Sequence, residues 1–129
     1  MDTFNPDYYQ NDLGFECIDL TEQYSFNAGN CLKYMFRLHG KNTVSENLGK
    51  AAWYARRAHR HGERFRPVLP SDSNDADRLL RTLAENDWQH VAPFWDTVAA
   101  CHAGAADTED VMNTIDQLIA TIDNARNAR

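Results

Sequence analysis

This sequence of 129 residues lacks most of the features that assign a chain to a well-known class. No apolar run approaches the ~18 residues needed to cross a bilayer, and the acidic, polar N-terminus does not resemble a secretory signal. Neither a GxxxxGK(S/T) loop nor a GxGxxG motif is present, which excludes a P-loop kinase. We therefore expect no membrane partner, and any phosphoryl transfer would have to proceed without a P-loop.

Cysteine is also scarce. The residues Cys17, Cys31 and Cys101 are odd in number, widely spaced and without a CxxC pair. This pattern argues against a disulfide framework or a zinc site and indicates reduced thiols in a cytoplasmic compartment. Because all three lie in apolar helical contexts, we expect them to be small core residues.

The alternation of apolar and polar residues that is typical of strands is absent, whereas apolar spacings of three and four recur through most of the chain. We expect an all-α fold, a single compact domain of about six helices with a central helical hairpin. The expected helices cover residues 15–24, 26–38, 46–61, 75–85, 88–102 and a last one from Asp107 or Thr108. The hairpin belongs to a region 1–62, a loop covers 63–74, and a helical extension 75–129 packs on the hairpin region.

Several helix ends are suggested by residue type. Ser25 and Ser45 are expected N-caps, and Gly40 and Gly62 are expected left-handed C-terminal caps. Ile18 is expected to face inward from the first helix. Pro93 either kinks its helix or stands close to where that helix begins. The last helix has a wide apolar stripe, so a homo-oligomer is an open alternative.

The net charge of −6 hides a strong asymmetry. From Lys33 to Arg66 there are nine Lys/Arg and two Asp/Glu, whereas the remaining segments hold four and seventeen. A positive middle in an acidic protein indicates one anionic ligand bound at one place. The alternative is a solvated helix face paired with acidic neighbours. A nucleic-acid partner is not expected, because the chain is acidic overall and the basic residues 56–66 surround their helix.

Polar residues line one face of each hairpin helix. Asn30, Lys33 and Arg37 are three and four residues apart, and the second helix carries a similar stripe at Glu46, Lys50 and Tyr54. Residues at these spacings share a helix face. Two such faces side by side predict a polar pocket suited to an anion such as phosphate.

The hairpin sequence also resembles a known family. The run FNAGNCLKYMFR at 26–37, the turn Gly40-Lys41 and the run ENLGKAAWY at 46–54 follow an ECID motif at 16–19. Together they resemble the SaV-like domain of unknown function found mainly in tailed phages and prophages, whose members include a phage nucleotide kinase. The resemblance covers about residues 5–57. Asn47 stands where an aspartate is common in that family, and Gly49 where a lysine is common.

The resemblance implies a phage or prophage protein of nucleotide metabolism that binds nucleoside phosphates in the host cell cytoplasm. Its most concrete form is a nucleoside monophosphate kinase without a P-loop. The departures at Asn47 and Gly49 leave open a protein that binds without catalysing. The alternative is a non-catalytic nucleotide-binding phage protein or one that interacts with a host protein.

On this interpretation the candidate residues have distinct roles. Cationic side chains would hold and neutralise phosphates, Glu46 would orient Lys50, and Asn30 would bind a sugar hydroxyl or base edge. Aromatic side chains would stack on the base. The full set comprises Lys33, Arg37, Glu46 and Lys50 as catalytic candidates, and Asn30, Tyr34, Lys41, Trp53 and Tyr54 as ligand-binding candidates. In the structural alternative, Lys33 and Arg37 pair with Glu16, Asp19 or Glu22, and Trp53 and Tyr54 belong to the core.

A cofactor is suggested at one place. Glu16 and Asp19 form an ExxD pair on one helix face, which predicts a Mg²⁺ site. The alternative is an ordinary solvated pair. The same pattern occurs in all-α nucleoside triphosphate pyrophosphatases, but these require a second acidic pair, which Glu46 and Glu85 do not form.

Overall fold

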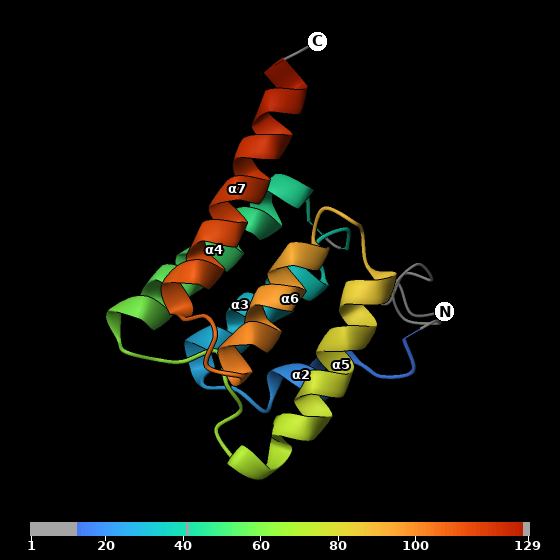
Figure 1. Cartoon of the computed structure of the whole chain (residues 1–129). Coiled ribbons are helices and arrows are strands. Elements are labelled where there is room, and N and C mark those ends of the chain that lie inside the picture. Colours follow the sequence, from blue (N-terminus) through green and yellow to red (C-terminus); the bar gives the residue numbers. More distant parts are fainter. Residues whose placement is uncertain (1–12, 41, 128–129) are drawn as a thin grey trace.

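The computed structural model describes residues 13–40 and 42–127. Within this part of the chain the fold contains six α-helices, one short 3-10 turn and no strand (Figure 1). The elements are α2 (Cys17–Thr21), α3 (Phe26–Phe36), α4 (Val44–Arg60), η1 (Pro70–Asp72), α5 (Ser73–Asn86), α6 (Ala92–His102) and α7 (Thr108–Asn127). The predicted all-α class is confirmed, including the helical hairpin α3–α4.

The hairpin packs directly against the C-terminal helices. Helix α4 contacts α3 on one side and α7 on another, and α6 packs against both α5 and α7. The C-terminal turns of α7 extend beyond the other helices (Figure 1). None of the helices in the described residues is long and apolar enough to span a membrane.

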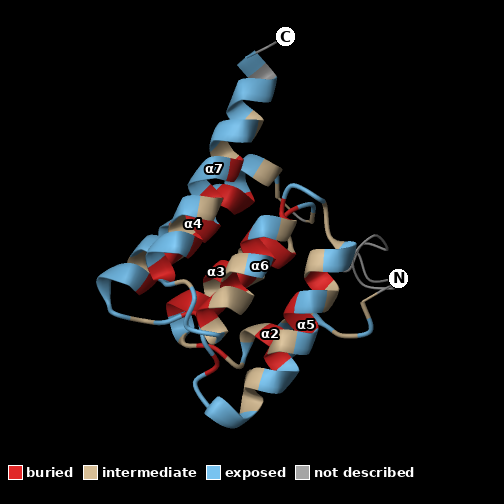
Figure 2. Cartoon of the chain, viewed as in Figure 1, coloured by how far each residue is buried: buried red, intermediate tan, exposed pale blue. Residues whose placement is uncertain are grey.

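The hairpin has a polar outer surface, but its inner face is apolar and closely packed. The inner face of α4 consists of Leu48 and four fully or almost fully buried alanines, at 51, 52, 55 and 58. Small side chains let α3 and α7 approach this helix closely, while larger residues such as Leu32, Met35 and Trp95 fill the space between elements. Figure 2 shows the buried residues turned inward and the exposed ones on the outer surfaces.

The cysteines follow the same pattern. Cys31 and Cys101 are buried, and Cys17 is partly buried against the core. Burial raises the pKa of the Cys17 thiol to about 12, although the charges of Arg37 and Lys33 oppose this shift. Burial likewise raises the pKa of Cys101 to about 11. All three thiols are therefore protonated at neutral pH, as expected of core residues.

Two of the predicted caps are wrong and two are correct. Ser25 is the N-cap of α3 and Gly62 has φ +71 after α4, as predicted. Helix α4, however, has Thr43 as its N-cap, two residues before the predicted Ser45, because Thr43 and Glu46 form a capping box. Gly40 does not have a positive φ. A Cβ at Gly40 would lie 3.2 Å from the carbonyl oxygen of Arg37, so the tight turn after α3 favours a glycine there.

The first and fifth predicted helices differ from the structure at their ends. Helix α2 is shorter than expected, and Ile18 is 61% exposed although an inward position was predicted. The buried residue of this helix is Leu20. Helix α6 begins at Ala92, so Pro93 lies in its first turn, where its missing N–H removes no helical hydrogen bond.

Helix α3 is anchored to α2 by a close backbone approach at Gly29. A Cβ at this position would lie 2.7 Å from the carbonyl oxygen of Thr21. A side chain at Gly29 would therefore force the two helices apart, so the glycine, unfavourable within a helix, serves close packing.

The N-terminus of α3 is held by a residue from a distant loop. The Glu63 carboxylate accepts hydrogen bonds from the Ser25 hydroxyl, from the Asn27 side chain and from the backbone N–H groups of Asn27 and Ala28. These bonds outweigh partial desolvation and lower the pKa of Glu63. A carboxylate at the positive end of α3 also matches the helix dipole. Thr108 at the start of α7 donates a hydrogen bond to the Glu63 carbonyl. Glu63 therefore links the starts of α3 and α7 to the loop that follows α4.

Candidate functional site

The outer surface of the hairpin carries an aromatic cluster with cations around it. Tyr34 of α3 and Tyr54 of α4 stack with ring centroids 5.9 Å apart and an interplanar angle of 12°. Trp53 meets the Tyr54 ring edge to face at 4.9 Å, and Phe26 does so at 6.3 Å. We call this surface the cation–aromatic face; it comprises Phe26, Lys33, Tyr34, Lys50, Trp53, Tyr54 and Arg57.

Three cations lie over the rings of this face. The ammonium nitrogens of Lys33 and Lys50 lie 4.8 and 5.4 Å from the centroid of Tyr34. The guanidinium carbon of Arg57 lies 5.4 Å from the centroid of Trp53. Each such contact contributes about 0.5–1 kcal/mol at an exposed site. The face therefore gathers positive charge over aromatic surfaces from two helices.

The exposed fractions distinguish a ligand surface from a core. Trp53 is 52% exposed and Phe26 is 73% exposed, so the interpretation of Trp53 as a core residue is wrong. Tyr34 and Tyr54 are partly buried and pack against the core. The tyrosine pair thus forms a fixed base, and Trp53 and Phe26 offer accessible ring surface.

The cations of the hairpin are not neutralised by the neighbouring helix. Among the described residues, the ion pairs are Arg78–Asp75 and His102–Asp77, and neither involves Lys33 or Arg37. The predicted alternative, in which these two residues pair with Glu16, Asp19 or Glu22, is therefore not what the structure shows. Within the described residues, Lys33 and Arg37 therefore have no carboxylate partner.

Glu46 and Asn47 have structural partners. The Glu46 carboxylate accepts hydrogen bonds from the Thr43 N–H and hydroxyl at 3.1 and 2.9 Å, which lower its pKa; the charge of Lys50 lowers it further. Asn47 is 2% exposed, and its amide donates to the carbonyls of Arg37 and Leu38 at 3.0 and 3.1 Å. Glu46 thus caps the start of α4, and Asn47 caps the end of α3.

Two of the remaining candidates, Asn30 and Arg37, belong to α3 and its C-cap. The Asn30 amide donates to the carbonyl of Phe26 at 2.8 Å, one turn earlier in α3. Arg37 is partly buried at the C-cap of α3. Lys41 lies outside the described residues. The structure therefore unites Lys33, Tyr34 and the α4 residues 50, 53 and 54.

The predicted Mg²⁺ pair is on α2. One oxygen of the Asp19 carboxylate accepts from the Glu16 backbone N–H at 2.8 Å, so this side chain caps its own helix. The described part of the chain contains no group of three His, Cys, Asp or Glu residues arranged to hold a metal. A Mg²⁺ at this pair would take its other oxygen ligands from water and phosphate, as Mg²⁺ commonly does.

The anion pocket between the two hairpin helices stays a prediction. Two cavities of about 300 and 550 Å³ are lined by described residues that do not belong to the cation–aromatic face. The larger is lined by acidic side chains of α2, η1 and α5, including Asp19, Glu22, Asp72 and Asp75. Such a lining does not suit a phosphate.

Sequence reasoning missed two members of the cation–aromatic face. The residue patterns indicate only a helix start at Phe26 and only a basic helix end at Arg57. The available signal was spacing, because Arg57 follows Trp53 by four residues and such pairs meet on a helix surface. The contact between Phe26 and Tyr54 joins different helices, so no local spacing predicts it.

A second polar cluster lies inside the molecule. The Tyr24 hydroxyl is 2.7 Å from His102 Nε2, and His102 Nδ1 is 2.7 Å from Asp77 Oδ1. The His102 side chain is only 2% exposed. The assignment that satisfies all three groups has a neutral imidazole, which donates to Asp77 and accepts from Tyr24. Desolvation lowers the pKa of His102, although Asp77 opposes this shift.

Part of the chain matches a known sequence family. Residues 4–56 match the model of the family described as a protein of unknown function, DUF3310. This segment contains α2, α3 and most of α4, and thus all of the cation–aromatic face except Arg57. Helices α5–α7 lie outside the match. No curated protein and no solved structure matches the chain.

Proposed function

We propose that the cation–aromatic face binds nucleoside phosphates. The observation that carries this proposal is the convergence of Lys33 and Lys50 on the stacked Tyr34–Tyr54 pair, with no ion pair from either lysine to a described carboxylate. The match of residues 4–56 to one family supports treating α2–α4 as a functional unit.

The phosphate end of the ligand belongs with the lysines. Two ammonium groups over one ring provide adjacent positive charges on flexible stems, which suits several phosphate oxygens at once. Arg37 lies one turn beyond Lys33 on the outer stripe of α3 and extends this positive surface. The acidity of the remaining chain repels anions elsewhere and favours this surface.

The base end belongs with the exposed aromatic rings. Trp53 and Phe26 flank the Tyr54 ring from two helices, so a planar base has ring surface on either side of the tyrosine pair. Stacking of a base on an aromatic side chain contributes about 1–3 kcal/mol. Because every base has a π-face, this contact favours nucleotides as a class over one particular base.

Within this proposal the reaction is transfer of a phosphoryl group to a nucleoside monophosphate in phage or prophage nucleotide metabolism. Such transfer requires cations that neutralise charge on the moving group. Lys33, Lys50 and Arg37 would supply these positive charges, and a bound Mg²⁺ would supply further positive charge. A non-catalytic nucleotide-binding protein, acting alone or on a host protein, is the second candidate. It is favoured by the observation that Glu46 and Asn47 are engaged in helix capping.

Isothermal calorimetry with deoxynucleoside monophosphates and triphosphates, with and without Mg²⁺, tests binding. We expect a saturable heat in the wild type and about a tenfold loss of affinity in each of Lys33→Ala and Lys50→Ala, since one charged contact contributes about 1.5–3 kcal/mol. Arg56→Ala is the matched control, because Arg56 is an exposed cation of α4 outside the cation–aromatic face.

Turnover is measured separately. Chromatography of products from a monophosphate and a triphosphate donor distinguishes the two candidates. A diphosphate product that disappears in Lys33→Ala supports the kinase. Binding without any product supports the non-catalytic protein, and the absence of both binding and turnover overturns the proposal.

A further inference from the structure

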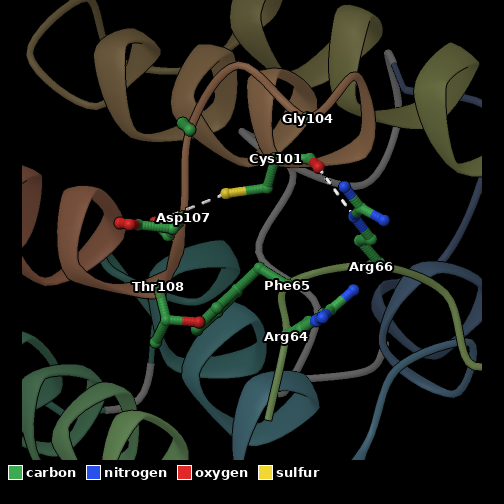
Figure 3. Close-up of a pocket in the computed structure, with 8 residues that line it drawn as sticks. Arg64, Phe65, Arg66, Cys101, Gly104, Asp107 and Thr108 are labelled. Atoms are coloured by element: carbon green, nitrogen blue, oxygen red, sulfur yellow. Dashed lines mark hydrogen bonds between the residues drawn. The ribbon is translucent and has the colours of Figure 1, made fainter. Parts of the chain in front are cut away.

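A separate cavity of about 300 Å³ lies between the loop after α4 and the junction of α6 and α7 (Figure 3). The first loop contributes Arg64, Phe65 and Arg66. The α6–α7 side contributes Cys101, Gly104, Ala106, Asp107 and Thr108. None of these residues belongs to the cation–aromatic face, and all lie outside the segment that matches the family.

Most polar side chains in the lining already have partners. Thr108 donates its hydroxyl to the Glu63 carbonyl at 2.8 Å. The Cys101 thiol donates to the Asp107 carbonyl at 3.6 Å, and the Asp107 carboxylate accepts from the Asp110 N–H at 3.1 Å. Figure 3 shows the Asp107 carboxylate on the opposite side of the cavity from the two arginines. The acceptors of the lining are thus committed to the protein itself.

The two arginines are the exception. Arg66 Nε donates to the Cys101 carbonyl at 2.9 Å, which fixes the position of its guanidinium. Gly104 lies beside this guanidinium: a Cβ there would be in ordinary van der Waals contact with Arg66 Nη2, at 3.5 Å. Neither Arg64 nor Arg66 forms an ion pair with a described carboxylate. Figure 3 shows both guanidinium groups on the same side of the cavity.

We propose that this cavity binds a small phosphate-bearing anion between Arg64 and Arg66. Two guanidinium groups that have no carboxylate partner among the described residues offer forked N–H donors that match phosphate oxygens. A volume of about 300 Å³ is at the lower limit of ligand sites, which indicates a phosphate ion or a small phosphomonoester. The fixed guanidinium of Arg66 positions the anion, and Arg64 completes the pair.

The test is an NMR titration of the full chain in which inorganic phosphate replaces chloride, so that the ionic strength stays constant. We expect saturable shifts at the Gly104 and Ala106 amides and at the Arg66 Nε–H. Arg64→Gln should weaken the affinity about tenfold or more, and Arg81→Gln, an exposed arginine of α5 outside the cavity lining, should leave it unchanged.

A second ligand and a second variant complete the test. Glycerol 3-phosphate binding more tightly than inorganic phosphate identifies a phosphomonoester, and the reverse order identifies the free ion. Lys50→Ala should keep the shifts at Gly104 and Ala106, which separates this site from the cation–aromatic face. The proposal is overturned if chloride produces the same shifts, or if Arg64→Gln and wild type bind phosphate equally while their thermal unfolding is also the same.

Discussion

The hairpin α3–α4 and the helices α5–α7 use their charged residues in different ways. In α5–α7 and their connections, several carboxylates serve the fold: Asp107 and Asp110 exchange hydrogen bonds at the start of α7, and Asp87 accepts from the Trp95 indole. On the hairpin, lysines lie over aromatic rings without an ion pair to a described residue. The comparison separates charges that hold the molecule together from charges left for a ligand.

The hairpin also contains structural polar groups, but these are acidic or neutral. Glu46 and Asn47, together with Glu63 from the loop after α4, each bind free backbone groups at a helix end of the hairpin. The division within the hairpin is therefore by charge sign: its carboxylates and amides cap helices, while its cations point outward. Variants of the two groups should consequently affect different measurements.

The largest effect is expected at Asn47. Asn47→Asp replaces a buried amide donor with a carboxylate that faces the carbonyl oxygens of Arg37 and Leu38. Because an unpaired buried polar group costs about 1–3 kcal/mol and a charged one more, we expect a loss of about 3 kcal/mol in the free energy of unfolding. Urea denaturation measures it. Unchanged stability together with new kinase activity would show that this position serves chemistry and not the fold.

The second effect concerns the cap of α3. Glu63→Ala removes the acceptor of four hydrogen bonds, two of them from backbone N–H groups. By analogy with N-cap substitutions we expect a loss of about 2 kcal/mol, measured by urea denaturation at pH 7. Because the folded pKa of Glu63 is lowered, its contribution is complete above pH 4.5 and is lost as the pH falls through the folded value. Equal stability losses at pH 7 and pH 3 would refute this assignment.

A smaller effect is expected from His102. Its pKa is lowered in the folded protein, so the unfolded chain binds a proton first as the pH falls. Stability from this group is complete above about pH 6.5, the ordinary pKa of the side chain, and is lost as the pH falls through the lowered folded value. Thermal unfolding from pH 7.5 to 5.5 measures the slope, and His102→Gln should flatten it. A slope that stays the same in His102→Gln assigns the pH dependence to another group.

The smallest stability effect is expected on the ligand face. Trp53 is half exposed, so Trp53→Ala should lower the free energy of unfolding by only about 0.5–1 kcal/mol, mainly through the lost contact with Arg57. Nucleotide affinity should nevertheless fall about fivefold to tenfold through lost stacking, and Trp53→Phe should restore most of it. Calorimetry and urea denaturation on the same samples separate the two quantities. A large stability loss without a change in affinity would place Trp53 in the structural group.

Local sequence patterns predicted the helices well, because apolar periodicity reports directly which face is buried. The stripes of α3, α4 and α7 and the position of Ser25 followed from spacing and capping preference alone. The errors occurred where a tertiary or competing local partner decides. Thr43 displaced Ser45 because Glu46 completes a capping box with it, and Glu63 was missed because its partners lie more than thirty residues away.

The same limit applies to the candidate site. The stripe containing Lys33 and the stripe containing Lys50 were visible from spacing. Tyr34 was predicted as a ring that stacks on a base, but not as the ring that both lysines approach. The register between α3 and α4 decides which residues of the two stripes meet, and no spacing within one helix determines it. Phe26 joins the face for the same reason.

The most direct test of the nucleotide site is an amide and indole NMR titration of the wild type with a deoxynucleoside monophosphate. We predict saturable shifts at Tyr34, Lys50 and Tyr54 and at the Trp53 indole N–H, with the buried Trp95 indole unaffected. Absence of saturable shifts at these four residues, or shifts confined to helices α5–α7, would contradict the assignment of the cation–aromatic face as the nucleotide site.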